Sequence, residues 1–311
     1  MRAANTKKAR LLFVDDEVQI LHSMRALFRH DYEVFLATSG NSAVDIVREH
    51  DIHVIVSDQR MPSMLGVELL RRVKEVSPNT MRIMLTGYAD REAVIGSVNK
   101  GEVFRFINKP WDNKILYDTV SQAAAIALRE LKIKPQVAAN DGIMGDPGIL
   151  IIEEDIDITT MLESILGNRY QLYFAASLRD ALETLQSHYV GVVIAETQVG
   201  PTDITVLIKA LKGHHPDIVT IVMTKRSDVM MVADLINQGQ IFRFLTKPVK
   251  PGICMLTVQA SMERHRRYRQ NPRLTDRYKV EADPSPPSQH STNIIARIKS
   301  LRSRLFQLRR H

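Results

Sequence analysis

Short apolar runs alternate with amphipathic stretches along most of the chain. In the first half, apolar runs predict strands over residues 10–14, 32–37, 53–57, 80–86 and 103–107. Apolar positions spaced three and four residues apart predict helices over residues 18–29, 41–50, 66–76, 90–100 and 113–132. Strands that are apolar throughout are typical of parallel sheets covered on both faces. The pattern therefore predicts an α/β fold with a doubly wound, five-stranded parallel sheet.

The whole pattern occurs twice. A shift of 138 residues places residues 10–126 over 148–264 without a gap, so that "GEVFRFINKPW" falls on "GQIFRFLTKPV". Two copies of this length indicate two homologous domains rather than a solenoid. We expect an N-terminal extension (1–9), a first domain (10–131), a linker (132–147), a second domain (148–263) and a basic, partly disordered tail (264–311).

Composition narrows the class of protein. The 311 residues are 44% hydrophobic and 25% charged, as in ordinary globular proteins, and no apolar run is long enough to cross a membrane. Cys254 is the only cysteine, which excludes an intrachain disulfide and fits a reducing cytoplasm. The chain has no glycine-rich nucleotide-binding motif, no GxSxG motif and no Cys/His cluster with metal-ligand spacing.

Polar residues stand where the strands of the first copy end. Asp15 and Asp16 follow the first strand, Asp58 the third, Thr86 the fourth and Lys109 the fifth. The carboxyl ends of parallel strands share one edge, where such sheets bind ligands. Carboxylates gathered there repel one another unless a cation intervenes, and Mg²⁺ prefers oxygen ligands. A carboxylate beside Mg²⁺ can accept a phosphoryl group whose oxygens a Lys and a Thr then hold.

Four segments carry a family resemblance: "VDDE" (14–17), "SDQRMPSMLGVELL" (57–70), "LTGYAD" (85–90) and "FINKPW" (106–111). In this order, they make the first copy resemble the receiver domain of bacterial two-component response regulators. The resemblance implies a flavodoxin-like fold, Mg²⁺, an upstream histidine kinase or phosphotransfer protein, and an effector protein downstream. The "FRF" and "KPWD" ending is similar to receivers joined to hydrogenase-regulating or cyclic-di-GMP-hydrolysing outputs, neither of which is found in this sequence.

The resemblance also implies residue roles. It makes Asp58 the phosphoacceptor and Asp15, Asp16, Asp58 and the backbone carbonyl of Arg60 the metal ligands. It implies that Thr86 and Lys109 hold the phosphoryl group, that Phe106 is the aromatic switch, and that the Lys109–Pro110 bond is cis.

The second copy departs from this pattern. Glu153 and Glu154 replace the acid pair, Glu196 replaces the acceptor, and "TQVGPTDI" replaces the loop after it, whereas Thr224, Phe244 and Lys247 are kept. We therefore expect a receiver fold without aspartyl-phosphate chemistry, a pseudo-receiver. Two explanations remain open: decay of an unneeded site, or a fixed Glu196–Lys247 pair that mimics an activated state.

The charge is concentrated in the tail. Residues 264–311 hold 13 Lys or Arg and three acids, so the rest of the chain is slightly acidic although the total is +7. A helix is predicted over about residues 292–310, with a stripe formed by Ile294, Ile298, Leu301, Leu305 and Leu308. It could pair in a coiled-coil homodimer, lie on an anionic membrane, dock into a partner or contact nucleic acid.

Three classes of function compete. The leading hypothesis is a non-enzymatic response regulator that signals through protein–protein contact. The alternative is a DNA-binding transcriptional regulator acting through the basic tail, although no helix-turn-helix pattern follows residue 262. A haloacid-dehalogenase-type phosphatase would instead need a DxD pair with its nucleophile on the first strand.

Overall fold

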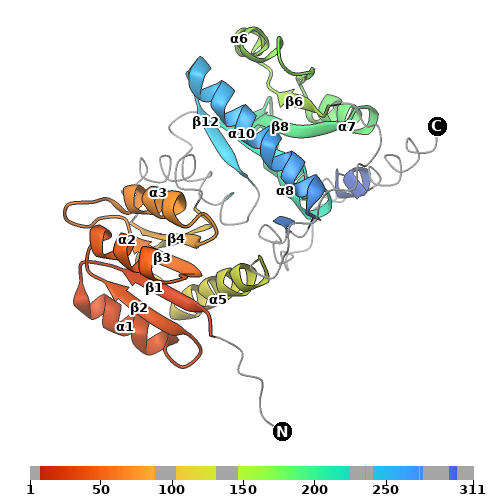
Figure 1. Ribbon diagram of the computed structural model, residues 1–311. Helices are drawn as coiled ribbons and strands as arrows, with labels where there is room; N and C mark the ends of the chain where they lie inside the picture. Colours follow the sequence, from red (N-terminus) through yellow and green to blue (C-terminus); the bar gives the residue numbers. More distant parts are fainter. Residues whose placement is uncertain are drawn as a thin grey trace. The chain divides into compact units, whose positions relative to one another are not determined.

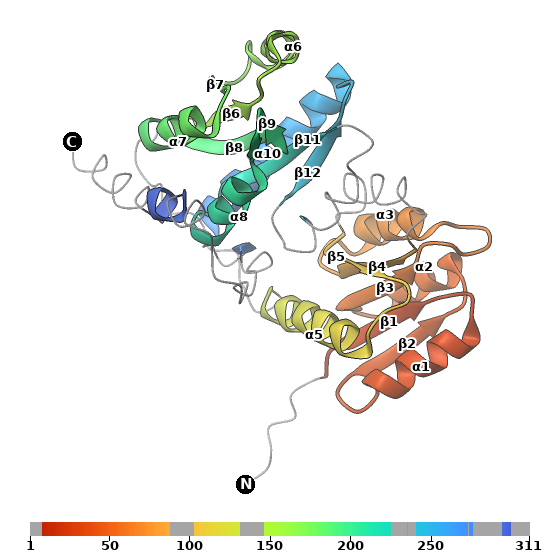
Figure 2. The ribbon, with the colours of Figure 1, turned by 180° about the vertical axis from the view of Figure 1, so that it is seen from behind.

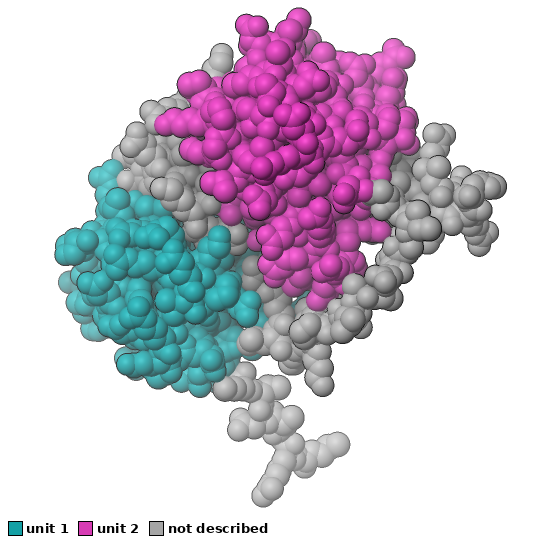
Figure 3. All heavy atoms as spheres, turned by 45° about the horizontal axis from the view of Figure 1, so that its top comes forward, with its two compact units in different colours: residues 1–134 teal, residues 135–311 magenta. Residues whose placement is uncertain are grey.

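The computed structural model describes residues 8–87, 103–130, 146–224, 235, 241–272, 274–275 and 294–299. It divides the chain into two compact units, residues 1–134 and 135–311, which are coloured separately in Figure 3. Among the described residues, no helix is long and apolar enough to cross a membrane.

The first unit is built on a parallel five-stranded sheet. Its strands are β1 (Arg10–Val14), β2 (Glu33–Ala37), β3 (Val54–Asp58), β4 (Met81–Thr86) and β5 (Arg105–Asn108). Its described helices are α1 (Val18–Phe28), α2 (Gly40–Glu49), α3 (Gly66–Val76) and α5 (Asn113–Glu130). The strand order is β2-β1-β3-β4-β5, with α1 and α5 on one face and α2 and α3 on the other (Figure 1). The order reverses between β1 and β3, so the ends of those two strands flank the usual ligand crevice.

The second unit repeats this architecture. Its sheet consists of β6 (Gly148–Ile152), β7 (Leu172–Ala175), β8 (Val190–Glu196), β11 (Val219–Thr224) and β12 (Arg243–Thr246). Its described helices include α6 (Ile156–Leu166), α7 (Leu178–Ser187), α8 (Thr205–His214) and α10 (Pro251–Gln270). Read from the other edge, the order β12-β11-β8-β6-β7 is the order of the first sheet. The predicted fold class is confirmed for both units.

The predicted strands and described helices of the first unit agree with the structure to within two residues at each boundary. The helix predicted over residues 90–100, the linker and most of the N-terminal extension lie outside the described residues. The last two residues of the extension contact the first unit. Ala9 is buried in its core, and the Lys8 ammonium donates to the carbonyl of His30.

The last helix of the second unit runs past residue 263, where we expected the second domain to end. The helix α10 continues to Gln270, so the first seven residues assigned to the basic tail are helical. His265 and Tyr268 are buried on the inner side of this last stretch. Arg266, Arg267 and Arg269 are exposed on its outer sides. These charged residues made the stretch look like a tail, although tertiary packing of the inner side stabilises a helix.

One feature of the second unit was not predicted, and part of another prediction is confirmed. After β8, a small antiparallel hairpin forms from β9 (Gln198–Val199) and β10 (Thr202–Asp203). Within the predicted tail helix, residues 294–299 are helical, and the remainder of that helix lies outside the described residues.

Candidate functional site

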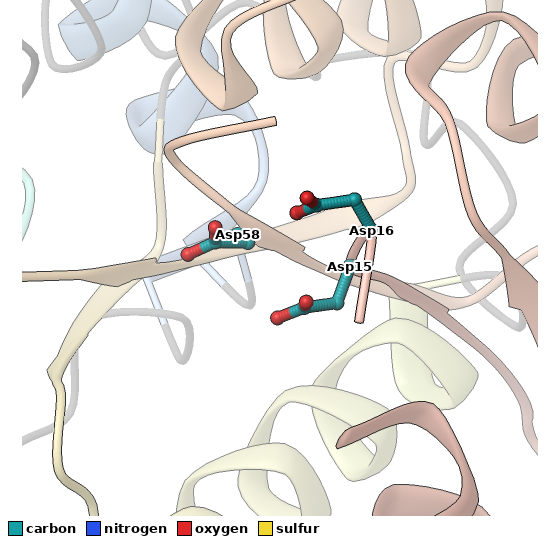
Figure 4. A group of neighbouring side chains, drawn as sticks. All are labelled: Asp15, Asp16 and Asp58. Carbon is teal, nitrogen blue, oxygen red and sulfur yellow. The ribbon is translucent and has the colours of Figure 1, made fainter. Parts of the chain in front are cut away.

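Three carboxylates of the first unit meet at the carboxyl edge of the sheet. Asp15 and Asp16 follow β1, and Asp58 is the last residue of its neighbour β3. One carboxylate oxygen from each lies within 4.8 Å of the other two (Figure 4). Asp15 and Asp58 are buried, whereas Asp16 is exposed. The topology thus gathers the acids that the sequence predicts at this edge.

Lys109 supplies a cation to this cluster. Its ammonium lies 2.8 Å from Asp58 Oδ1 and 3.2 Å from Asp15 Oδ2. Burial raises the pKa of Asp15, against the lowering effects of the Glu17 backbone amide and Lys109. Burial alone would lower the pKa of Lys109, but its bonds to Asp58 and its attraction to both carboxylates leave that pKa raised. Lys109 therefore stays protonated among the acids.

The remaining predicted residues surround the same edge. The Arg60 amide donates to Asp58 Oδ2 at 3.1 Å, which orients this carboxylate. Thr86 ends β4 and is buried, and its hydroxyl donates to the Gly87 carbonyl at 3.3 Å. Phe106 lies on β5 and is 4% exposed, so its ring is turned into the protein. The Lys109–Pro110 bond is cis, as predicted.

Gly66 is a residue of this site that the sequence did not single out. A Cβ atom here would lie 2.1 Å from the Asp58 carbonyl oxygen, which is closer than atoms can approach. The Gly66 amide also donates to the Gln59 carbonyl at 3.0 Å. Only glycine lets α3 begin so close to the end of β3. The "LG" at residues 65–66 was part of the family segment but received no role.

The donor set of the first site suits Mg²⁺. The three carboxylates offer hard oxygen ligands from two adjacent strand ends. Asp16 makes no hydrogen bond or ion pair with the described part of the chain, so its oxygens remain available to a cation. Lys109 alone cannot neutralise three acids, which further favours a divalent ion at this edge.

The second unit has a different arrangement at the equivalent edge. The Lys247 ammonium lies 2.5 Å from Glu196 Oε2 and 2.7 Å from Glu153 Oε2. Burial alone would lower the pKa of Lys247, but its hydrogen bonds to both glutamates leave it raised. The other oxygen of Glu196 accepts from the amide and hydroxyl of Thr197. Both of these carboxylates are therefore paired with groups of the protein itself.

Glu154 is directed away from this pair. Its Oε2 accepts from the amide of Gly200 at 3.0 Å, at the turn of the β9–β10 hairpin, where Gly200 has φ +55°. Among the described acids, Glu153, Glu154 and Glu196 do not form a metal-binding group as the three aspartates do. Ile204, fully buried, occupies the position of Gly66, so the backbone cannot make the same close approach. Mg²⁺ does not fit this second set of residues.

Thr224 and Phe244 of the second copy are fully buried, and Lys247–Pro248 is again cis. The framework around the altered site is therefore kept, and the difference lies in the acids and in the loop that follows β8. The sequence revealed the changed acids, but neither the hairpin nor the bond from Glu154 to Gly200.

The model of the response regulator receiver domain matches this chain at residues 11–121 and again at residues 149–259. The two matches are offset by the same 138 residues as the repeat. The chain belongs to the response regulator receiver family. It contains two receivers in tandem, and the acidic cluster lies in the first receiver.

Curated relatives match over the receiver region only. The hydrogenase transcriptional regulatory protein HoxA of Bradyrhizobium diazoefficiens is 34% identical over 131 residues, which are 42% of this chain and 27% of that protein. The chain thus spans about a quarter of that relative's length. Sporulation initiation phosphotransferase F of Bacillus subtilis is 30% identical over 114 residues, 36% of this chain and 91% of that protein.

Among solved structures, a signal receiver domain of an HD domain-containing protein from Pseudomonas fluorescens is 28% identical to this chain. It covers 43% of this chain and 100% of its own, with a TM-score of 0.40.

Proposed function

We propose that this protein is a two-component response regulator whose first receiver accepts a phosphoryl group on Asp58. The observation that carries the proposal is the cluster of three carboxylates with Lys109 2.8 Å from Asp58 Oδ1. Upstream, the donor is a histidine kinase or a phosphotransfer protein, and downstream the signal passes to an effector by protein contact. We place this activity in the cytoplasm, and the receivers themselves have a signalling role rather than an enzymatic one.

In this proposal, the residues at the carboxyl edge of the first sheet have separate roles in phosphoryl transfer. An oxygen of Asp58 attacks phosphorus, a new O–P bond forms, and the donor leaves with the electron pair of the bond that breaks. Asp15, Asp16 and Asp58, with the backbone carbonyl of Arg60, would hold Mg²⁺, which supplies positive charge to the phosphoryl oxygens. Lys109 is placed to bind a second oxygen, and Thr86 a third.

The switch follows from how those residues are held. Thr86 must turn from the Gly87 carbonyl toward a phosphoryl oxygen, and this movement opens space beside β4. Phe106 lies on the adjacent strand β5 and, in this proposal, moves into that space. The surface around β4 and β5 then differs between the two states, and that difference is what the effector reads.

Phosphorylation with a small donor tests this function directly. We expect the full-length protein to gain one phosphoryl group from acetyl phosphate and Mg²⁺, measured by intact mass and mapped to the peptide holding Asp58. The Asp58→Asn variant should gain none at this position, and chelation of Mg²⁺ should stop the reaction. Label retained in Asp58→Asn and mapped outside Asp15 and Asp16 would contradict the proposal.

We infer that the second receiver is a pseudo-receiver that neither binds Mg²⁺ nor accepts phosphate. The support is that Glu196 and Glu153 share Lys247, and Glu154 bonds to Gly200. Glu196 is one methylene longer than aspartate, so its carboxylate fills space that a phosphoryl group needs. The ion pair would fix Thr224 and Phe244 in one arrangement, which favours the activated-state mimic over decay.

Two variants at the same position separate these explanations. Glu196→Asp should not become phosphorylated, because Glu154 remains bonded to the hairpin and no aspartate pair is restored. Glu196→Gln keeps the shape and removes the charge. Under the mimic explanation, the Gln variant should change the amide hydrogen exchange of β11 and β12. Unchanged exchange would leave decay as the better account.

A further inference from the structure

The base of the second receiver, at the amino ends of its strands, differs from the base of the first. At the end of α8, His215 stands where the first copy has Ser77. On α10, Tyr268 replaces Glu130. These replacements lie opposite the acidic edge, so the loss of phosphoryl chemistry does not explain them.

Tyr268 belongs to a group of contacting residues that forms the floor of this base. The Lys212 ammonium donates to the Pro216 carbonyl at 3.2 Å and lies 5.6 Å from the centre of the Tyr268 ring. The Arg264 guanidinium donates to the Tyr268 hydroxyl at 3.2 Å. Lys212 and Tyr268 are both buried, so this floor is packed rather than open to solvent.

The C-terminal helix rests on this base. Ile294 is 3% exposed and Ile298 is fully buried. One ring nitrogen of His215, Nε2, lies 3.0 Å from the Ile298 carbonyl oxygen and can only donate to it. Figures 1 and 2 both show this short helix beside the end of α8. The contact thus combines two buried apolar side chains with one hydrogen bond.

Ile294 and Ile298 are the first two residues of the apolar stripe predicted along the tail. A helix cannot present the same side chains to its own domain and to another apolar phase. The docked arrangement therefore competes with any use of the stripe elsewhere.

The composition of the tail indicates which other binding surface competes with the docked arrangement. DNA would meet the cations of the tail and would not require the isoleucines to be freed. Residues 291–311 hold six Lys or Arg and no acid, so two copies paired along the stripe would bring like charges together. An anionic lipid surface instead uses both features, because the stripe enters the interface and the cations bind headgroups.

We propose that the base of the second receiver, around His215, masks the tail in cis, and that the freed tail binds an anionic membrane surface. This proposal is independent of phosphorylation at Asp58. The variant His215→Ala weakens the dock and leaves the tail sequence unchanged. A larger fraction of molecules is then competent for the membrane, and the apparent affinity rises by the same factor.

The experiment is co-sedimentation of full-length protein with phosphatidylglycerol/phosphatidylcholine vesicles, and with vesicles of phosphatidylcholine alone. We expect His215→Ala to bind the anionic vesicles about five-fold more tightly, the change that one lost hydrogen bond produces. His22→Ala, an exposed histidine of α1, is the matched control and should behave as the wild type. Removal of residues 291–311 should abolish binding.

A second variant distinguishes membrane insertion from simple attraction of charges. Ile298→Ser also weakens the dock, but it removes an apolar residue that the membrane needs, so binding should not rise. Equal gains in His215→Ala and Ile298→Ser would overturn the proposal, as would equal binding to neutral vesicles or no gain in His215→Ala. Dimerisation or DNA binding that increases in His215→Ala without increased vesicle binding would also overturn it. Circular dichroism establishes that each variant is folded.

Discussion

Lys247 holds the second acidic site together, and its removal gives the sharpest test of the difference between the two receivers. In Lys247→Gln, the carboxylates of Glu153 and Glu196 lose the cation that they share. Their side chains are only 3% and 13% exposed, so water replaces the lost charge poorly. Breaking a buried pair in this way costs about 3–5 kcal/mol. Because Lys247 is itself 15% exposed, we expect the lower end, about 3 kcal/mol.

The matched variant is Lys109→Gln in the first receiver, which leaves Asp15 and Asp58 without their lysine. Here a divalent cation can take the place of the ammonium, because Asp16 completes a set of oxygen ligands. Saturating Mg²⁺ should therefore restore much of the stability that Lys109→Gln loses. The same Mg²⁺ should leave Lys247→Gln unchanged, since Glu154 is bonded to Gly200.

The assay is urea denaturation of the full chain with two probes. Trp111 is the only tryptophan and packs against the first core, so its fluorescence follows the first receiver. Far-ultraviolet circular dichroism follows both receivers. A loss of 3 kcal/mol lowers the urea midpoint for unfolding of the second receiver by about 1.5 M if its free energy of unfolding falls by about 2 kcal/mol per molar urea. A loss under about 1 kcal/mol, or rescue of Lys247→Gln by Mg²⁺, would refute the reasoning.

Three further variants test other parts of the structure. Burial lowers the pKa of His265, so the unfolded chain binds more protons than the folded chain, and the second receiver should lose stability as pH falls from about 7 to 5. Urea titrations should show that the stability of His265→Gln depends less steeply on pH. The same pH dependence in His265→Gln and the wild type would refute this. Gly66→Ala should destabilise the first receiver by about 2 kcal/mol or more and impair phosphorylation, because its Cβ meets the Asp58 carbonyl oxygen. Gly213→Ala, at an open position of α8, is its control and should be neutral or slightly stabilising in the same titration.

Much of the fold could be predicted because the signals are local and occur twice. Apolar runs locate the strands, and the rule that ligands bind at carboxyl strand ends brings Asp15, Asp58 and Lys109 together before any coordinates exist. The sheet order and the cis Lys109–Pro110 bond followed from the family resemblance rather than from periodicity.

The features that were missed depend on contacts between distant residues. The bond from Glu154 to Gly200 requires the hairpin, which the changed loop "TQVGPTDI" did not reveal. The length of α10 was not foreseen because the arginines after residue 263 were interpreted as the start of the basic tail. The repeat itself contained the answer, since residue 131 of the first copy corresponds to residue 269 of the second.

The tandem arrangement has a consequence for how a partner measures the signal. Two receivers on one chain present an effector with two surfaces of the same fold, only one of which responds to phosphate under our proposal. A partner that contacts both would be kept nearby by the constant surface, at a high effective concentration, and would then sense the first receiver as an intramolecular step. The second receiver would set how much of the partner is bound, and the first would set how the bound partner responds to phosphate. Each property could then change without altering the other.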